Sequence, residues 1–425
     1  MNEINTEKNI QESYRLAKER YASLGVDTDQ AMRELSHIAL SLHCWQGDDV
    51  GGFERAGSEI GGGLAVTGNY PGKARNADEL RQDLEQVYRM LPGNHRLALH
   101  AIYGEFAGKK VDRDQVKPEH FSTWVSWAKE QKLGLDFNPT LFAHPKADSG
   151  MTLSSYNPAI RRFWIDHCIA CRQIGAFMGK SLETPCVTNI WIPDGYKDTP
   201  FDRKTPRQLL KDSLDEILTE PINPQWNKDA VEGKLFGIGA ESYTTGSHEF
   251  YLGYAATKGI LLCLDSGHFH PTEGIADKLS SVLFYVPEVL LHVSRGVRWD
   301  SDHVVTLTDD LQAIAQEVIR GGFQNRVHIG LDYFDASINR IAAWTVGARN
   351  GLKALLLALL EPQAMLRDME LSMDFTARLA LLEEVKSMPF GPVWDYYCLK
   401  MDVPVGAGMI DDIKSYEKNT LSKRS

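Results

Sequence analysis

The sequence alternates short apolar runs with longer amphipathic segments, and this alternation restricts its fold more than any other feature. Eight apolar runs have the length and composition of β-strands: residues 38–45, 96–103, 133–139, 186–193, 229–236, 260–265, 288–294 and 326–332. The segments between them carry apolar residues at helical spacing, as in residues 77–91, 118–132, 206–220 and 310–322. Strands and helices in alternation form parallel sheets, and eight such units close a barrel. We therefore predict an α/β fold, a (β/α)8 TIM barrel. A doubly wound open sheet is the alternative, but no GxGxxG motif follows the first strand.

The chain has 425 residues, more than a barrel of typical size requires. Beyond residue 340 the pattern is almost entirely helical. We expect residues 1–345 to form the barrel with its N-terminal helices. We expect residues 346–425 to form a C-terminal helical extension that contacts a neighbouring subunit.

The net charge and the lengths of the apolar runs indicate which classes of binding partner the chain can have. The net charge is −11, from 46 basic and 57 acidic residues, which argues against nucleic acid and anionic membranes as partners. The longest apolar run, residues 354–360, is far shorter than the roughly 20 residues of a membrane-spanning helix. The N-terminus lacks an apolar signal segment, and the six cysteines are scattered, as expected of reduced thiols. We therefore expect a cytoplasmic protein that acts on a small neutral molecule.

Acidic and imidazole side chains close the later apolar runs. The active site of a barrel lies at the C-terminal ends of its strands, so these side chains should converge there. All are of metal-ligand or proton-transfer type: Glu232, Asp265, His268, His292, Asp300, Asp302 and Asp332.

Two of these positions have neighbours that sharpen the prediction. Glu232 and Lys234 share one face if the strand continues through both, which suits a metal ligand beside a proton donor to a sugar oxygen. An ordinary surface ion pair is the alternative. Asp265 and His268 can converge through a turn at Gly267. The alternative is an Asx turn with an unrelated loop histidine.

The other candidates are interpreted as metal ligands because several of them occur together, not because of any one residue alone. His292 alone would be interpreted as a core histidine, and Asp332 as the partner of Arg340 in a structural salt bridge. Asp300 and Asp302, two apart in extended chain, would present like charges on one side, which is unfavourable without a cation between them. A solvated acidic turn is the alternative.

Together these residues predict two divalent cations. One set is Glu232, Asp265, His292 and Asp332; the other is His268, Asp300 and Asp302. Oxygen-rich ligands with one imidazole each suit Mn²⁺, Mg²⁺ or Co²⁺, with Zn²⁺ also compatible. Two ions roughly 4 Å apart would hold both oxygens of a reacting group.

Aromatic residues near the ends of the first strands indicate a sugar pocket. Trp45, His100 and Trp191 combine apolar faces with polar groups, as in sites that bind the C–H faces and hydroxyls of sugars. The alternative is that the two tryptophans simply cover the barrel core.

Long, unusual segments of the chain resemble the L-rhamnose isomerase family, bacterial cytosolic enzymes of the xylose-isomerase-like barrel group. These segments are residues 41–54, 66–86, 189–198, 234–244, 262–273, 290–305 and 328–344. The resemblance covers nearly the whole chain. It implies interconversion of L-rhamnose and L-rhamnulose, Mn²⁺ as the metal and a homotetramer.

The resemblance also assigns roles to residues. The structural metal falls on the first ligand set above and the catalytic metal on the second. Lys234 matches the family's active-site lysine, and we assign catalysis to Lys234, Asp302 and Asp332. His100 and Trp191 line the sugar pocket, and Phe137 is a further candidate there.

Metal ligands at the barrel mouth, rather than an isolated base, favour a metal-assisted 1,2-hydride shift over an enediol route. Three alternatives stay open at the level of sequence. They are a metal-dependent hydrolase on the same barrel, an isomerase for another aldose, and a non-catalytic sugar-binding or structural protein.

Overall fold

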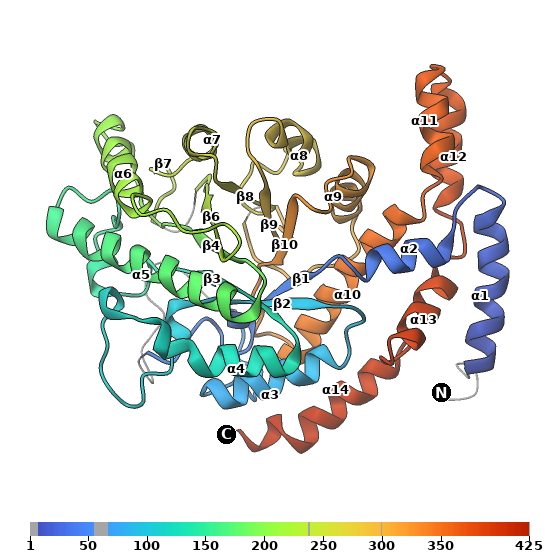
Figure 1. The fold of residues 1–425 in the computed structure, drawn as a ribbon, viewed down its shortest axis with the longest axis horizontal. Coiled ribbons are helices and arrows are strands. Elements are labelled where there is room, and N and C mark those ends of the chain that lie inside the picture. Colours follow the sequence, from blue (N-terminus) through green and yellow to red (C-terminus); the bar gives the residue numbers. More distant parts are fainter. Residues whose placement is uncertain (1–6, 55–66, 237–238, 299, 425) are drawn as a thin grey trace.

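The computed structural model describes residues 7–54, 67–236, 239–298 and 300–424, and its centre is a closed barrel of parallel strands (Figure 1). The eight barrel strands are β1 (Leu40–His43), β2 (His95–His100), β3 (Gly134–Asn138), β4 (Cys186–Ile190), β6 (Asn227–Glu232), β8 (Leu261–Asp265), β9 (Val289–Val293) and β10 (Val327–Leu331). They pair in chain order, and β10 closes the barrel by pairing with β1. The predicted (β/α)8 fold is therefore confirmed.

Each barrel strand is followed by a helix. These helices are α3 (Ala77–Tyr88), α4 (Ser122–Gln131), α5 (Pro158–Leu182), α6 (Lys204–Ile217), α7 (His248–Lys258), α8 (Ala276–Leu283), α9 (Asp309–Arg320) and α10 (Arg340–Leu359). Polar side chains accept hydrogen bonds from first-turn backbone N–H groups and so fix where several helices begin. Asn76, Asn157, Thr308 and Asn339 do so for α3, α5, α9 and α10. A two-stranded antiparallel sheet, β5 (Gly195–Tyr196) with β7 (Tyr243–Thr244), lies outside the barrel.

Alternate residues of the strands fill the barrel interior in layers. A small apolar cluster combines Val187, Ala230, Leu261, Cys263 and Leu290 from four strands. Because side chains alternate along a strand, the residues two positions further on face the same interior, closer to the C-terminal ends. On β4, β6, β8 and β9 these are Asn189, Glu232, Asp265 and His292. The interior therefore changes from apolar to acidic within one layer.

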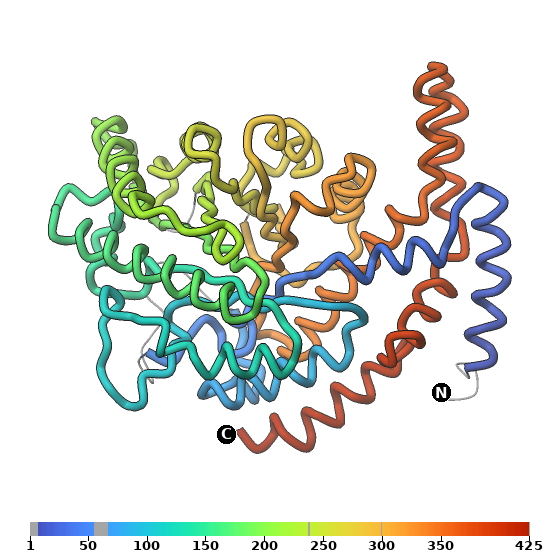
Figure 2. Tube along the Cα trace, in the orientation of Figure 1, coloured from blue at the N-terminus to red at the C-terminus, as the bar shows by residue number. Residues whose placement is uncertain are grey.

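Most of the remaining helices lie to one side of the barrel, and the last of them, α14, runs back along it toward α3 (Figures 1 and 2). These remaining helices are α1 (Glu7–Ala22), α2 (Thr28–Leu35), α11 (Gln363–Leu371), α12 (Phe375–Val385), α13 (Phe390–Lys400) and α14 (Gly408–Asn419). The rings of Tyr14 on α1 and Tyr396 on α13 stack at 3.9 Å, and α11 and α12 form a hairpin that projects away from the barrel. The tail returns to the barrel, where Arg424 pairs with Asp83 of α3 at 2.6 Å.

Helix α10 belongs to both parts of the chain. Its first residues follow β10 as the eighth barrel helix, and its end leads into the helical extension, so the expected boundary at residue 345 falls inside it. Within the described residues, no helix is both long and apolar enough to span a membrane.

Candidate metal centre and active site

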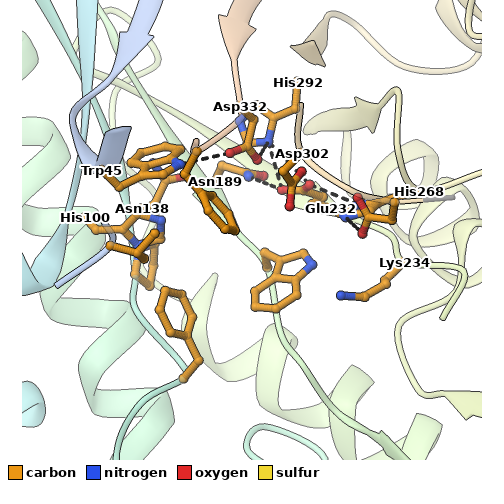
Figure 3. Close-up of a pocket in the computed structure, with 16 residues that line it drawn as sticks. Trp45, His100, Asn138, Asn189, Glu232, Lys234, His268, His292, Asp302 and Asp332 are labelled. Atoms are coloured by element: carbon orange, nitrogen blue, oxygen red, sulfur yellow. Dashed lines mark hydrogen bonds and ion pairs between the residues drawn. The ribbon is translucent and has the colours of Figure 1, made fainter. Parts of the chain in front are cut away.

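A cavity opens at the C-terminal ends of the barrel strands (Figure 3). Ten of its lining residues were expected from the sequence: Trp45, His100, Trp191, Glu232, Lys234, His268, His292, Asp300, Asp302 and Asp332. They come from strand ends and from the loops that follow them, as the position of barrel active sites requires.

Four buried or half-buried ligand-type side chains converge at the base of the cavity, and three of them line it. Glu232, Asp265, His292 and Asp332, which we call the inner set, each offer one ligand atom within 4.8 Å of the others. His292 is at the centre, because its Nδ1 lies 3.3 Å from Glu232, 3.2 Å from Asp332 and 3.8 Å from Asp265. Strand register places Asp265 directly beside His292 on the adjacent strand. The structure thus brings together all four members of the first predicted ligand set.

A second group lies beside the first and shares one residue with it. Asp265, His268 and Asp300, which we call the outer set, also offer ligand atoms within 4.8 Å of one another. His268 Nε2 lies 3.4 Å from Asp300, while its Nδ1 donates a hydrogen bond to the backbone oxygen of Gly233 at 2.9 Å. A carbonyl oxygen only accepts hydrogen bonds, so Nδ1 carries the proton and Nε2 faces Asp300 as a potential ligand.

The outer set differs from the second predicted set in one member. Asp265 takes the place expected for Asp302, which lines the cavity but is not part of the three-residue group. The interpretation of residues 300–302 as extended chain is wrong, because Asp302 has a left-handed backbone with φ of +44°. Its carboxylate is therefore not placed by strand alternation.

The two ligand sets together contain more carboxylates than cationic groups, and this shifts the pKa values of their members. Burial and neighbouring carboxylates raise the pKa of Asp265 to about 8, and the same causes raise the pKa of Asp302. Against the effect of burial, His292 lowers the pKa values of Glu232 and Asp332. The carboxylates thus compete for two imidazoles, which is the imbalance that bound cations relieve.

Hydrogen bonds from neighbouring side chains orient two of the carboxylates. Trp45 Nε1 donates to Asp332 Oδ1 at 3.0 Å, and Asn189 Nδ2 donates to Glu232 Oε2 at 2.6 Å. The alternative of a salt bridge between Asp332 and Arg340 is wrong, because Nε and Nη2 of Arg340 donate hydrogen bonds to Asp49 at 2.8 and 2.7 Å, and its Nη1 donates to the backbone oxygen of Tyr70.

Lys234 lies beyond the strand rather than on it, because β6 ends at Glu232. Its ammonium nitrogen lies 4.9 Å from the centre of the Trp191 ring and lines the cavity. Glu232 is only 3% exposed and bonds the two histidines and Asn189. The alternative of a surface ion pair with Lys234 is therefore wrong.

Aromatic rings form one wall of the cavity. Neighbouring rings contact edge to face in the order Trp45, His100, Phe142 and Trp191, with centres 4.8, 5.6 and 6.0 Å apart. Phe137 is absent from the lining. Its buried ring contacts Phe121 at 4.9 Å, on the outer face of β3.

Six lining residues were missed from the sequence: Val50, Asn138, Pro139, Phe142, Asn189 and Phe334. Asn138 and Asn189 end or nearly end β3 and β4, so the rule that identified Glu232 could have found them had it been extended to amides. Alternation along β3 places Asn138 inside the barrel and Phe137 outside. The other four lie after strands, where alternation gives no signal.

Comparison with known proteins covers almost the entire chain. A family model described as L-rhamnose isomerase (RhaA) matches residues 8–424. The L-rhamnose isomerase of Rhodopirellula baltica is 58% identical over 422 residues, which is 99% of each chain. Those of Salmonella paratyphi B and Escherichia coli O9:H4 are 59% identical over 416 and 415 residues, 98% of this chain and 99% of each relative.

Proposed function

This chain belongs to the L-rhamnose isomerase family, and from that premise we propose that its barrel cavity converts L-rhamnose to L-rhamnulose with two bound divalent cations. The protein is thus a sugar isomerase, which is an intramolecular oxidoreductase. The alternative prediction of a metal-dependent hydrolase is wrong. One observation carries the assignment to this cavity: the inner and outer ligand sets meet under an aromatic wall at one rim of the barrel.

The ligand atoms suit divalent cations. Asp300 Oδ1 is buried without a hydrogen-bond partner among the described residues, and an unpaired buried carboxylate oxygen is costly. The donors are carboxylate oxygens and imidazole nitrogens, which Mn²⁺, Mg²⁺ and Co²⁺ accept readily. We assign the inner set to the more enclosed ion, and the outer set with Asp302 to the ion nearer the substrate. We propose Mn²⁺ as the ion used.

Isomerisation moves the C2 hydrogen to C1 with its electron pair, while one proton passes from O2 to O1. Bound cations supply Lewis acidity to these two oxygens. The Lys234 ammonium is placed to donate a hydrogen bond to the carbonyl oxygen. Trp45 and Trp191 border the sugar and limit the access of water, and Asp302 and Asp332 face its reacting end.

The alternative enediol route needs a base on the sugar. His100 is the candidate, because burial lowers its pKa to about 4 and leaves the ring neutral. Most other titratable groups in the cavity belong to the ligand sets, which supports the hydride shift. L-Rhamnose tritiated at C2 should deliver its label to C1 of L-rhamnulose, whereas extensive release of tritium to water would assign the reaction to an enediol.

The helical extension supports a homotetramer. Helix α12 has no buried residue, and the hairpin of α11 and α12 exposes Leu371, Met373, Phe375 and Leu379 to between 50% and 76%. Exposed apolar surface of this kind marks protein contacts. We propose that the hairpin meets a neighbouring subunit. Light scattering should give four chains for the wild type and fewer for Leu371→Glu/Leu379→Glu, whereas an unchanged mass would contradict the assignment.

We also propose a cytoplasmic location. All six cysteines are buried and free, as suits a reducing compartment. Fractionation of the producing cells would test this, and recovery of the enzyme outside the cytoplasmic fraction would contradict it.

A further inference from the structure

Cys263 lies directly under the inner set and has no role in the chemistry above. It is on the inner face of β8, two residues before Asp265, and strand register makes it the neighbour of Glu232 on β6. Its side chain belongs to the apolar cluster inside the barrel and is 2% exposed. A valine or an alanine would fill such a layer equally well, so the thiol there calls for an explanation.

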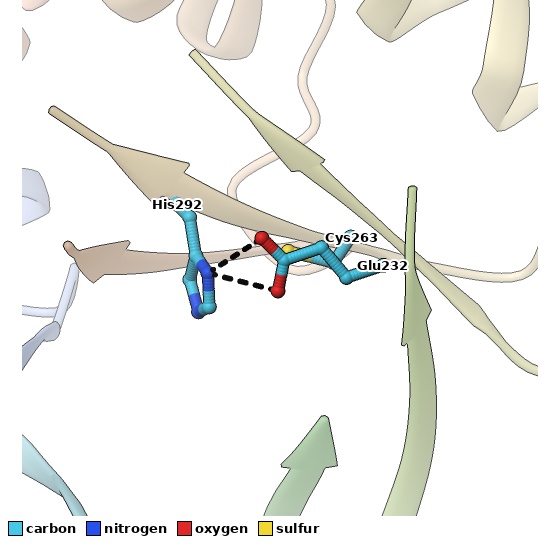
Figure 4. Close-up of side chains that lie close together, drawn as sticks. All are labelled: Glu232, Cys263 and His292. Atoms are coloured by element: carbon cyan, nitrogen blue, oxygen red, sulfur yellow. Dashed lines mark hydrogen bonds and ion pairs between the residues drawn. The ribbon is translucent and has the colours of Figure 1, made fainter. Parts of the chain in front are cut away.

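The Cys263 sulfur has two ligand-type neighbours. Glu232, Cys263 and His292 each offer one atom within 4.8 Å of the others, and all three are buried (Figure 4). The His292 ring lies against β10 at Gly330, where an added Cβ would come within 3.3 Å of the ring. Among the described residues, Cys263 is the one cysteine that belongs to a group of this kind.

We propose that Glu232, Cys263 and His292 form a deeper cation position, which we call the deep site, that favours thiophilic divalent ions such as Cd²⁺ and Zn²⁺ and also accepts the borderline ion Co²⁺. The proposal rests on the cation site proposed above, because the deep site borrows Glu232 and His292 from the inner set. One ion therefore occupies either the inner set or the deep site. The hardness of the ion decides which, since thiolates select soft ions and carboxylates hard ones.

Charge supports this division. A thiolate, one carboxylate and a neutral imidazole balance a divalent ion, leaving no net charge in the apolar layer. The inner set places three carboxylates and one imidazole around the ion, which suits Mn²⁺ nearer the polar cavity. As the sulfur–metal bond forms, the thiol releases its proton to water, so occupation of the deep site liberates one proton per ion.

The distances are compatible with coordination after a small movement. In a tetrahedral zinc site, metal–ligand bonds of about 2.0–2.3 Å place the ligand atoms roughly 3.5 Å apart. The three atoms of the deep site lie within 4.8 Å of one another. A contraction of at most about 1.3 Å, within the reach of side-chain rotation, brings them into range.

Cobalt provides a direct test, because a thiolate ligand adds a near-ultraviolet charge-transfer band that oxygen and nitrogen ligands do not give. The full-length protein, stripped of metal and titrated with Co²⁺, should show this band. Cys263→Ser should abolish it, while the matched control Cys186→Ser, which changes another fully buried strand cysteine, should retain it. Cys263→Ser should also weaken Cd²⁺ binding about tenfold or more, with Mn²⁺ binding changed by less than about threefold.

A wild-type measurement covers the case in which Cys263→Ser does not fold. X-ray absorption of protein carrying one Zn²⁺ per chain should show a sulfur neighbour at about 2.3 Å. A shell of only oxygen and nitrogen would overturn the deep site, as would a cobalt band that persists in Cys263→Ser. If Mn²⁺ still supports isomerisation in those cases, the proposed function survives; if no divalent ion binds at all, both proposals fail.

Discussion

The two ends of the barrel differ in what surrounds their buried and half-buried carboxylates. Toward the N-terminal ends of the strands, Asp136 bonds the Arg96 guanidinium at 2.9 Å, and Glu288 lies 2.5 Å from both Lys228 and His328. Despite burial, Arg96 lowers the pKa of Asp136, and His328 and Lys228 lower that of Glu288 to about 2. At this end, basic side chains of the chain itself balance the charge of the carboxylates.

At the C-terminal ends the carboxylates meet imidazoles and one another. Burial and like charge raise the pKa of Asp265 to about 8, whereas the pKa of Asp136 is lowered. The same barrel therefore has one end whose carboxylates pair with cationic side chains of the chain itself and one end whose carboxylates outnumber them. We propose that cations bind and the reaction occurs at this second, unbalanced end.

The largest expected effect concerns the balanced end, by which we mean the N-terminal ends of the strands, where carboxylates pair with cationic side chains. Arg96→Met should lower the free energy of unfolding by about 3–5 kcal/mol, because it leaves Asp136 as an uncompensated buried charge. Urea denaturation measures this. Arg96→Met/Asp136→Leu should recover much of the loss, since both charges are then absent. A single variant as stable as the wild type would mean that this end is not held by its ion pairs.

Substitutions at the unbalanced end, the C-terminal ends of the strands, should lower the catalytic activity more than the free energy of unfolding. Asp302→Asn should lower kcat/KM for L-rhamnose by about a hundredfold to a thousandfold, or about 3–4 kcal/mol of activation free energy, because an anionic group facing the reacting oxygens is lost. Asp212→Asn, an exposed helix position, is the control. Full activity in Asp302→Asn would remove this residue from the site.

Asp332→Asn should reduce the difference in stability between the metal-loaded and the metal-free protein. With Mn²⁺ at about 100 times its dissociation constant, binding adds about 2.7 kcal/mol to the stability of the wild type. The variant should lose the increment that the inner-set ion contributes, so its melting temperature should rise less with Mn²⁺ than that of the wild type, although the outer set remains intact. A melting temperature that rises with Mn²⁺ as in the wild type would contradict the assignment of Asp332 to the inner set.

The smallest effect concerns pH at the balanced end. The pKa of Glu288 is lowered to about 2 from its ordinary value of 4.5, so its contribution to stability is complete above about pH 4.5 and is lost as the pH falls toward 2. Glu288→Gln should flatten the dependence of unfolding free energy on pH in this window by about 1–2 kcal/mol. Parallel curves for the two proteins would show that the Glu288 cluster adds nothing.

The strands were predictable because barrel strands are buried on both faces and leave continuous apolar runs. Each barrel strand lies within its predicted run, except that β2 and β6 begin one and two residues earlier, at His95 and Asn227. The acidic residues were found for the complementary reason: Glu232, Asp265 and Asp332 interrupt or end such runs at the barrel mouth, and Asp300 and Asp302 lie in the loop that follows one.

What the sequence did not reveal depends on geometry that no pattern encodes. The bridging position of Asp265 between the two ligand sets depends on barrel closure, and the left-handed backbone of Asp302 depends on its loop. Arg340 pairs with Asp49, 291 residues away, instead of its near neighbour Asp332. Phe137 is a candidate for the sugar pocket only through the family resemblance, whereas alternation along β3 directs its ring to Phe121, away from the cavity.

The most direct test of the account is to count bound ions and measure activity on the same samples. Protein dialysed against metal-free buffer should retain two divalent ions per chain. Exhaustive chelation should remove both ions and abolish the conversion of L-rhamnose to L-rhamnulose, and added Mn²⁺ should restore it. An ion-free protein that still isomerises the sugar at full rate in excess chelator would contradict the claim that the unbalanced end of the barrel exists to hold cations.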